Sequence, residues 1–138
     1  MCMGINRYLF LMLLLFPSLC SADWIDDRIE DWSVENTAGQ VIWYTLQGLD
    51  YSQTKEIVKH PDRYHEKNPR CAPKHPDSQD VNDCFIWWTV AQTAVVFLLP
   101  QKVKVGEFNI YPRYMFQGLS IAGSGKTVYL NWKVMREF

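Results

Sequence analysis

One stretch decides the fold: CFIWWTVAQTAVVFLL, residues 84–99, which contains no charged side chain. Ser78 or Asp77 is suited to cap a helix that begins near Asp80 and ends at Leu99. The uncharged part is shorter than the 18 or so residues that make a membrane-spanning helix the default. Two interpretations therefore stay open: a buried core helix, or a short, tilted or interfacial membrane helix.

The segment upstream, from Thr37 to Lys59, is also predicted to be a helix. Ser33, Asn36 and Thr37 are candidate N-caps at its start, and His60-Pro61 ends it because the residue before a proline avoids the helical region. Asp50 interrupts its apolar pattern, which is unfavourable unless the carboxylate faces water or finds a partner. The apolar stripe consists of residues at helical spacing: Val41, Tyr44 and Leu49, broadened by Ile42, Trp43 and Leu46.

The rest of the chain completes a mostly α-helical prediction with about three main helices. Residues 23–36 are expected to form a short amphipathic turn or helix, and the proline-rich segment 62–82 a structured loop. Residues 101–107 are a basic connection containing a glycine, and 108–122 are a third apolar segment, interrupted by proline and arginine. The partly alternating strip 127–138 is expected to be a short C-terminal extended segment.

Residues 1–22 have the pattern of a secretory signal peptide. Arg7 precedes the apolar run 8–16, and small residues follow at 20–22. A helix of nine residues spans roughly 13 Å, less than half of a bilayer core of about 30 Å, so a retained anchor is the weaker alternative. We predict export, with residues 23–138 as a single mature domain.

The composition of the mature chain excludes some partners. It carries 13 Lys and Arg (14 in the whole chain less Arg7) against 15 Asp and Glu. No concentrated basic segment of the kind that binds nucleic acid is present. All six Trp residues lie in the mature chain, which suits either a core of few large side chains or a protein at the membrane–water boundary.

Cys71 and Cys84 are the two cysteines that remain after signal cleavage. An even pair in an oxidising compartment predicts a disulfide, which would tie the loop to the helix that follows it. Closing a loop of this size stabilises the fold by about 3 kcal/mol in the chain-entropy model. The alternative is two free thiols, with Cys84 buried as a small apolar side chain.

A polar cluster is the candidate site. Asp50 and Thr54 lie at positions i and i+4 of the predicted helix, so they share a face. Gln53 lies beside them, and Glu66 and Asn68 follow in the loop. These five residues either line a polar pocket or hydrogen-bond the loop to the helices.

Other motifs predict no cofactor and no metal. The string Gly123–Thr127 imitates the end of a phosphate-binding loop, but Ser120 stands where that motif requires glycine, so we predict a glycine-rich turn and no nucleotide. His60, His65 and His75 do not have the spacing of a zinc site. The chain contains no Gly-x-Ser-x-Gly motif for nucleophilic catalysis.

Scattered motifs of the mature chain resemble a family of small exported proteins of bacteriophages and proteobacterial prophages. That family has no established activity, so the resemblance implies origin and export and no reaction. The chain departs from the family pattern at Arg70-Cys71-Ala72, at Cys84 and near Phe116-Gln117-Gly118. The matching motifs are Ala22-Asp23-Trp24, Asp50-x-x-Gln53-Thr54, His60-Pro61-Asp62-Arg63-Tyr64-x-Glu66-x-Asn68-Pro69, His75-Pro76, Phe85 and Leu99-Pro100.

These observations predict a non-enzymatic envelope protein of phage or prophage origin. It would act in the periplasm or at the inner membrane, on an envelope protein or on the membrane surface. A small periplasmic hydrolase using Asp50 and Glu66 as a carboxylate pair is one alternative. An inhibitor or immunity-type binding protein is another, which an exposed apolar patch away from any membrane would favour.

Overall fold

The computed structural model describes residues 22–60 and 77–136, and for residues 22–24 only the backbone. Its elements are α2 (Ala22–Glu30), α3 (Val34–Lys59), α4 (Ser78–Leu98), β1 (Val103–Val105), β2 (Phe108–Ile110) and α5 (Pro112–Arg136). The prediction of a mostly helical fold is confirmed. The long helices before and after the undescribed segment lie within a few residues of their predicted bounds.

The chain divides into two compact units, one up to Trp32 and one from Ser33 onward. In the described part of the first unit, α2 corresponds to the short helix predicted at the mature N-terminus. A contact of 3.7 Å joins the Arg28 guanidinium to the Asp31 carboxylate, across i and i+3. The second unit contains the three long helices and the two strands, and all further statements concern it.

Side-chain caps fix the starts of α3 and α4. The Ser33 hydroxyl accepts a hydrogen bond from the Asn36 backbone N–H at 3.2 Å. At α4 the Asp77 carboxylate accepts from two backbone N–H groups, and the Asp80 carboxylate accepts from the Asp77 N–H, which completes a capping box. Each cap satisfies donors that a helix leaves open in its first turn. Both caps were among those predicted from the sequence.

The C-terminal third of the chain corrects two predictions. Residues 123–127 do not form a turn, and residues 127–136 are not extended, because α5 runs without a break from Pro112 to Arg136. Pro112 starts the helix well, since its missing N–H is not needed in the first turn. Glycine within a helix costs about 1 kcal/mol. Packing of α5 along α3, through buried Ser124 and Asn131, offsets that preference.

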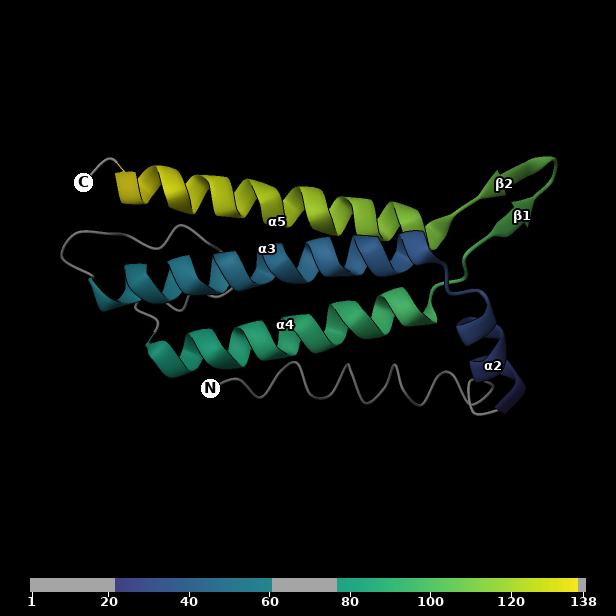
Figure 1. Ribbon diagram of the computed structural model, residues 1–138, viewed down its shortest axis with the longest axis horizontal. Coiled ribbons are helices and arrows are strands. Elements are labelled where there is room, and N and C mark those ends of the chain that lie inside the picture. The colour runs from purple at the N-terminus through teal and green to yellow at the C-terminus, as the bar shows by residue number, and fades with distance from the viewer. Residues whose placement is uncertain (1–21, 61–76, 137–138) are drawn as a thin grey trace. The chain divides into compact units, whose positions relative to one another are not determined.

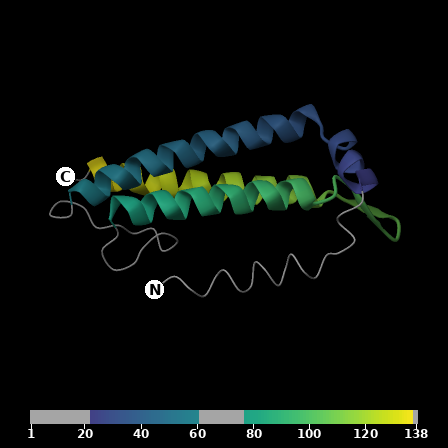
Figure 2. The same ribbon diagram turned by 90° about the horizontal axis from the view of Figure 1, so that it is seen from below.

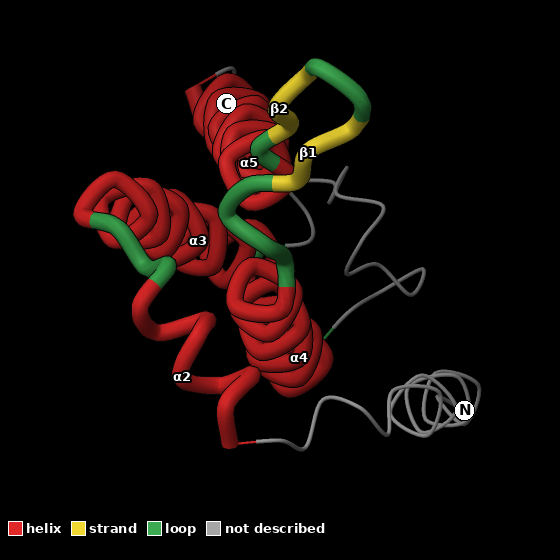
Figure 3. The backbone as a smooth tube through the Cα atoms, turned by 90° about the vertical axis from the view of Figure 1, so that its right-hand side faces the viewer, coloured by secondary structure: helices red, strands yellow, loops and turns green. Residues whose placement is uncertain are grey.

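The three long helices lie side by side (Figures 1 and 2), and the view along their axes shows a triangular arrangement (Figure 3). The helices α3 and α5 run in the same direction, and α4 runs in the opposite direction. The end of the bundle that holds the start of α3, the end of α4 and the start of α5 is called here the hairpin end. The other end, where α3 and α5 finish, is called the far end.

A short β-hairpin joins α4 to α5 at the hairpin end (Figure 3). Its strands β1 and β2 are antiparallel, with Val103 opposite Ile110 and Val105 opposite Phe108. Gly106 has φ +63°, a left-handed conformation that glycine adopts without strain at the first position of a tight hairpin turn. Residues 101–107 were expected to be a connection, and the two strands were not predicted.

Candidate functional site

The interior of the bundle is largely polar. Trp43, Ile57, Val81, Phe85, Val96 and Val134 are the buried apolar side chains among the described residues. Buried polar side chains are usually few and must be hydrogen-bonded, so a polar interior is the informative feature of this fold. The buried polar and charged residues outnumber the apolar ones: Asn36, Gln40, Gln47, Asp50, Thr54, Gln92, Arg113, Gln117, Ser124 and Asn131.

A ladder of hydrogen bonds joins α3 to α5 at intervals of seven residues. The three rungs pair Gln40 with Gln117, Gln47 with Ser124, and Thr54 with Asn131. The seven-residue spacing is that of two helices packed by a heptad repeat, and both members of each rung move up by one heptad together. Successive rungs are about 10.5 Å apart, so the ladder extends over roughly 21 Å of the bundle.

At the rung nearest the hairpin end, three glutamines connect the three helices. The Gln117 Nε2 donates to the Gln40 Oε1 at 3.4 Å, and the Gln40 Nε2 donates to the Gln92 Oε1 at 2.9 Å. The Gln92 Nε2 has no hydrogen-bond partner among the described residues, although its side chain is buried. A buried donor left in that state costs about 1–3 kcal/mol.

The predicted polar cluster is partly assembled at the far end of the ladder. Asp50 and Thr54 share a face as predicted, and Thr54 Oγ1 lies 3.4 Å from Asp50 Oδ1. Asn131, which the sequence analysis did not select, donates from Nδ2 to Asp50 Oδ1 at 2.8 Å. Gln53, at i+3 from Asp50, is half-buried, and its Oε1 is buried without a hydrogen-bond partner among the described residues. Glu66 and Asn68 lie outside the described residues, so their part in the cluster stays a prediction.

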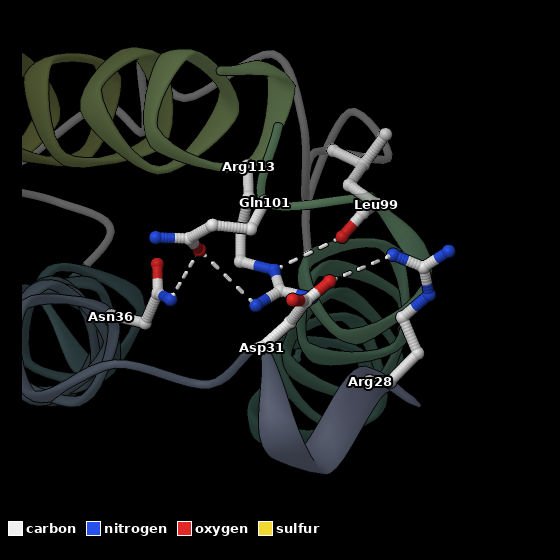
Figure 4. A network of polar contacts seen from close by, with 6 residues as sticks. All are labelled: Arg28, Asp31, Asn36, Leu99, Gln101 and Arg113. Carbon is white, nitrogen blue, oxygen red and sulfur yellow. Dashed lines mark hydrogen bonds and ion pairs between the residues drawn. The ribbon is translucent and has the colours of Figure 1, made fainter. Parts of the chain in front are cut away.

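A second polar network closes the hairpin end (Figure 4). The fully buried Arg113 guanidinium donates from Nε to the Leu99 carbonyl at 3.0 Å and from Nη1 to the Gln101 Oε1 at 3.3 Å. Asn36 Nδ2 donates to the same Gln101 oxygen at 2.6 Å, and Gln101 Nε2 donates to the Tyr114 hydroxyl at 2.7 Å. The network ties both legs of the hairpin to the start of α3.

The outward face of each long helix is mostly apolar, although α3 also exposes hydroxyls such as those of Thr45 and Ser52. The predicted stripe of Val41, Tyr44 and Leu49 lies on the outside of the bundle, and Trp43 is the member of that apolar set that is buried. The predicted apolar stripe is present at helical spacing, but it lies on the surface of the bundle and not in the core. Large apolar side chains are exposed on all three helices: Val41, Ile42, Tyr44 and Leu49 on α3; Ile86, Trp87, Trp88, Val90, Val95 and Leu98 on α4; Met115, Leu119, Tyr129, Leu130 and Trp132 on α5.

Charged residues are confined almost entirely to the two ends of the helices. In α3 the span 36–54 contains one charged residue, the buried Asp50. In α4 the span 84–98 contains none, and in α5 the span 114–132 contains only the exposed Lys126. These three spans define the apolar belt, a band around the bundle about 22–28 Å tall at 1.5 Å per residue.

By length and composition alone, α4 is the one described helix long and apolar enough to cross a membrane. Its burial does not match a core helix, because 22% of its most apolar window is buried. The average composition of α3 and α5 includes their inward amides, which a bilayer would not contact. Large apolar side chains are nevertheless exposed on α3 and α5 as well as on α4.

One member of the predicted disulfide lies within the described residues. Cys84 lies on α4, half-buried against the apolar cluster of Val81 and Phe85. Cys71 lies outside the described residues, so the Cys71–Cys84 bond stays a prediction. The histidine cluster also lies mostly outside the described residues, and His60 contacts the Glu56 carboxylate at 3.1 Å on the surface.

In comparisons with known proteins, no family model, no curated protein and no solved structure matches the chain. The resemblance to exported phage proteins therefore stays a prediction. The residues that sequence reasoning missed are the interior amides and Ser124. Their signal was the shared seven-residue spacing of Gln40, Gln47 and Thr54 with Gln117, Ser124 and Asn131.

Proposed function

We propose that the chain is an exported envelope protein that is embedded in a lipid bilayer through α3, α4 and α5. The observation that carries the proposal is the inverted polarity of the bundle, with amides inside and large apolar side chains outside. In water this arrangement loses burial of apolar surface, whereas in lipid it places each surface in its preferred surroundings.

The dimensions of the bundle support the same proposal. The helices α3, α4 and α5 have 26, 21 and 25 residues. At 1.5 Å per residue they are about 39, 32 and 37 Å long, against about 30 Å for a bilayer core. Lys126 is the exposed charge within the belt, six residues inside the end of the belt at residue 132, so in a bilayer its side chain would have to extend toward the interface.

Interaction within the membrane is the molecular role that this geometry favours over hydrolysis. The Asp50 carboxylate is buried and accepts a hydrogen bond from Asn131, so it helps to join α3 to α5. The proposed hydrolase would need Glu66 near it, which lies outside the described residues. A role as a soluble binding protein would require a partner that covers the apolar belt.

Membrane extraction tests the proposal. Membranes from cells that express the tagged chain are washed with alkaline carbonate and with urea, which remove peripheral proteins, and then with a mild detergent. We expect the chain to resist both washes and to appear in the detergent extract as a folded helical protein. A mature chain recovered as a soluble monomer without detergent contradicts the proposal, and a soluble complex with another protein supports the binding-protein alternative.

A further inference from the structure

We infer that the β1–β2 hairpin lies in the interfacial layer of the bilayer, with one face against lipid. This inference rests on the membrane location proposed above. It concerns a surface that the bundle does not use, and it names the occupant of that surface as phospholipid at the boundary of headgroups and acyl chains.

The strand register gives the hairpin two chemically different faces. Residues directly opposite each other in an antiparallel pair share a face, and successive residues alternate. The pairs Val103–Ile110 and Val105–Phe108 therefore place four apolar side chains on one face. The pair Lys104–Asn109 lies on the other face. All four apolar side chains are exposed, and Phe108 is the most exposed at 77%.

The hairpin is held at its base and is not packed through its strands. The buried Arg113, which follows β2, bonds the Leu99 carbonyl and the Gln101 side chain, which precede β1 (Figure 4). An isolated two-stranded hairpin is marginally stable at best in water. A rigid base and an uncovered apolar face together point to an occupant that the described residues do not supply.

Lipid is the occupant that the position of the hairpin favours. Both legs continue directly from the apolar belt, since Leu98 ends α4 with 42% of its surface exposed and Tyr111 precedes α5 with 41% exposed. Tyrosine is enriched at the membrane–water interface. Lys104, on the opposite face, is placed to reach headgroups or water. A protein partner that covers the same face is the competing occupant.

Site-specific photo-crosslinking identifies the occupant. Benzoylphenylalanine is incorporated in place of Phe108 on the apolar face and, as a matched control, in place of Asn109 on the opposite face of the same strand. Both positions are exposed, so neither replacement disturbs packing. Cells that express the full chain are irradiated, and the purified protein is weighed by mass spectrometry. We expect phospholipid adducts at position 108 many-fold more often than at position 109.

Two results would overturn the inference: a protein adduct at position 108, or lipid adducts at position 108 no more frequent than at 109. The same membranes are washed with alkaline carbonate before analysis. Release of the chain by this wash would contradict the proposed membrane location itself. A chain that stays in the membrane without lipid adducts at position 108 contradicts only the placement of the hairpin.

Discussion

At the far end of α3, the two sides of the helix meet their neighbours through different chemistry. On one side Asp50 and Thr54 meet Asn131 of α5 through hydrogen bonds. On the other side Tyr51 packs on Phe85 of α4, with the ring centroids 5.4 Å apart in an edge-to-face arrangement, and the Tyr51 hydroxyl donates to Asn82 Oδ1 at 2.7 Å. Apolar contact tolerates small displacements, whereas a hydrogen bond is lost within a fraction of an ångström. The hydrogen bonds on both sides, more than the ring contact, therefore fix the register of the bundle.

The relative strength of apolar contacts and hydrogen bonds between helices also depends on the surrounding solvent. Lipid tails are as apolar as leucine, so apolar contact between helices in a bilayer gains little beyond van der Waals packing. Hydrogen bonds and close packing then hold the helices together. In water the same apolar contact would be the stronger one. The following predictions test which of these conditions applies to this chain.

The largest effect is expected from a charge on the outside of the bundle. Val90 is 54% exposed within the apolar belt of α4. In a bilayer, Val90→Arg should cost about 3 kcal/mol of insertion free energy, the value typical of arginine at a helix centre. The measurement is the fraction of chains that resist alkaline extraction from the membrane.

The matched control is Val34→Arg, at an 82% exposed position outside the belt at the start of α3. We expect it to change the insertion free energy, obtained from the extraction-resistant fraction, by less than about 0.5 kcal/mol, as for most surface substitutions. An equally small effect at Val90 would show that this surface faces water. The apolar contact between Tyr51 and Phe85 would then be the stronger one.

The next effect comes from removing one partner of the buried carboxylate. Asn131→Leu takes away the donor at 2.8 Å from Asp50 Oδ1 and leaves the carboxylate with fewer hydrogen bonds. A buried group that loses its partner costs about 1–3 kcal/mol, and more when it is charged. We expect Asn131→Leu to lower the free energy of unfolding by about 2 kcal/mol, measured by denaturant titration in mixed micelles.

The double variant Asp50→Leu/Asn131→Leu is the control, because it removes the carboxylate together with its donor. It should be more stable than Asn131→Leu alone, since a matched apolar pair leaves no unsatisfied group. A double variant whose loss equals the sum of the two single losses would show that the two side chains do not interact.

The sequence predicted the helices where local signals were strong. The capping residues and the proline after His60 placed α3 and α4 within a few residues of their bounds. Gly123 and Gly125 favoured a turn in α5, but contacts with α3, distant in sequence, overrode that local preference. The orientation of the helices could not be read from periodicity, because the same stripe marks a core in water and a surface in lipid.

The candidate site was predictable only within one helix. The i,i+4 relation of Asp50 and Thr54 predicted their shared face from sequence spacing alone. Their partner Asn131 lies 81 residues from Asp50, and no local rule connects the two. The undescribed segment holds the remaining predicted members, so the proposed pocket is neither assembled nor contradicted.

The smallest effect tests the middle rung of the ladder. Gln47 Nε2 donates to the Ser124 hydroxyl at 2.7 Å, and both groups are neutral and buried. The coupling energy of Gln47→Leu and Ser124→Ala in a double-mutant cycle should be about 0.6 kcal/mol, the average for such bonds within a membrane. As a control, Thr45→Ala removes a hydroxyl that bonds its own helix at the Val41 carbonyl, and it should show no coupling to Ser124→Ala. A coupling at Gln47 as small as the control would mean that this rung does not help to set the register, which would then depend on the contacts of Asp50 and Gln40.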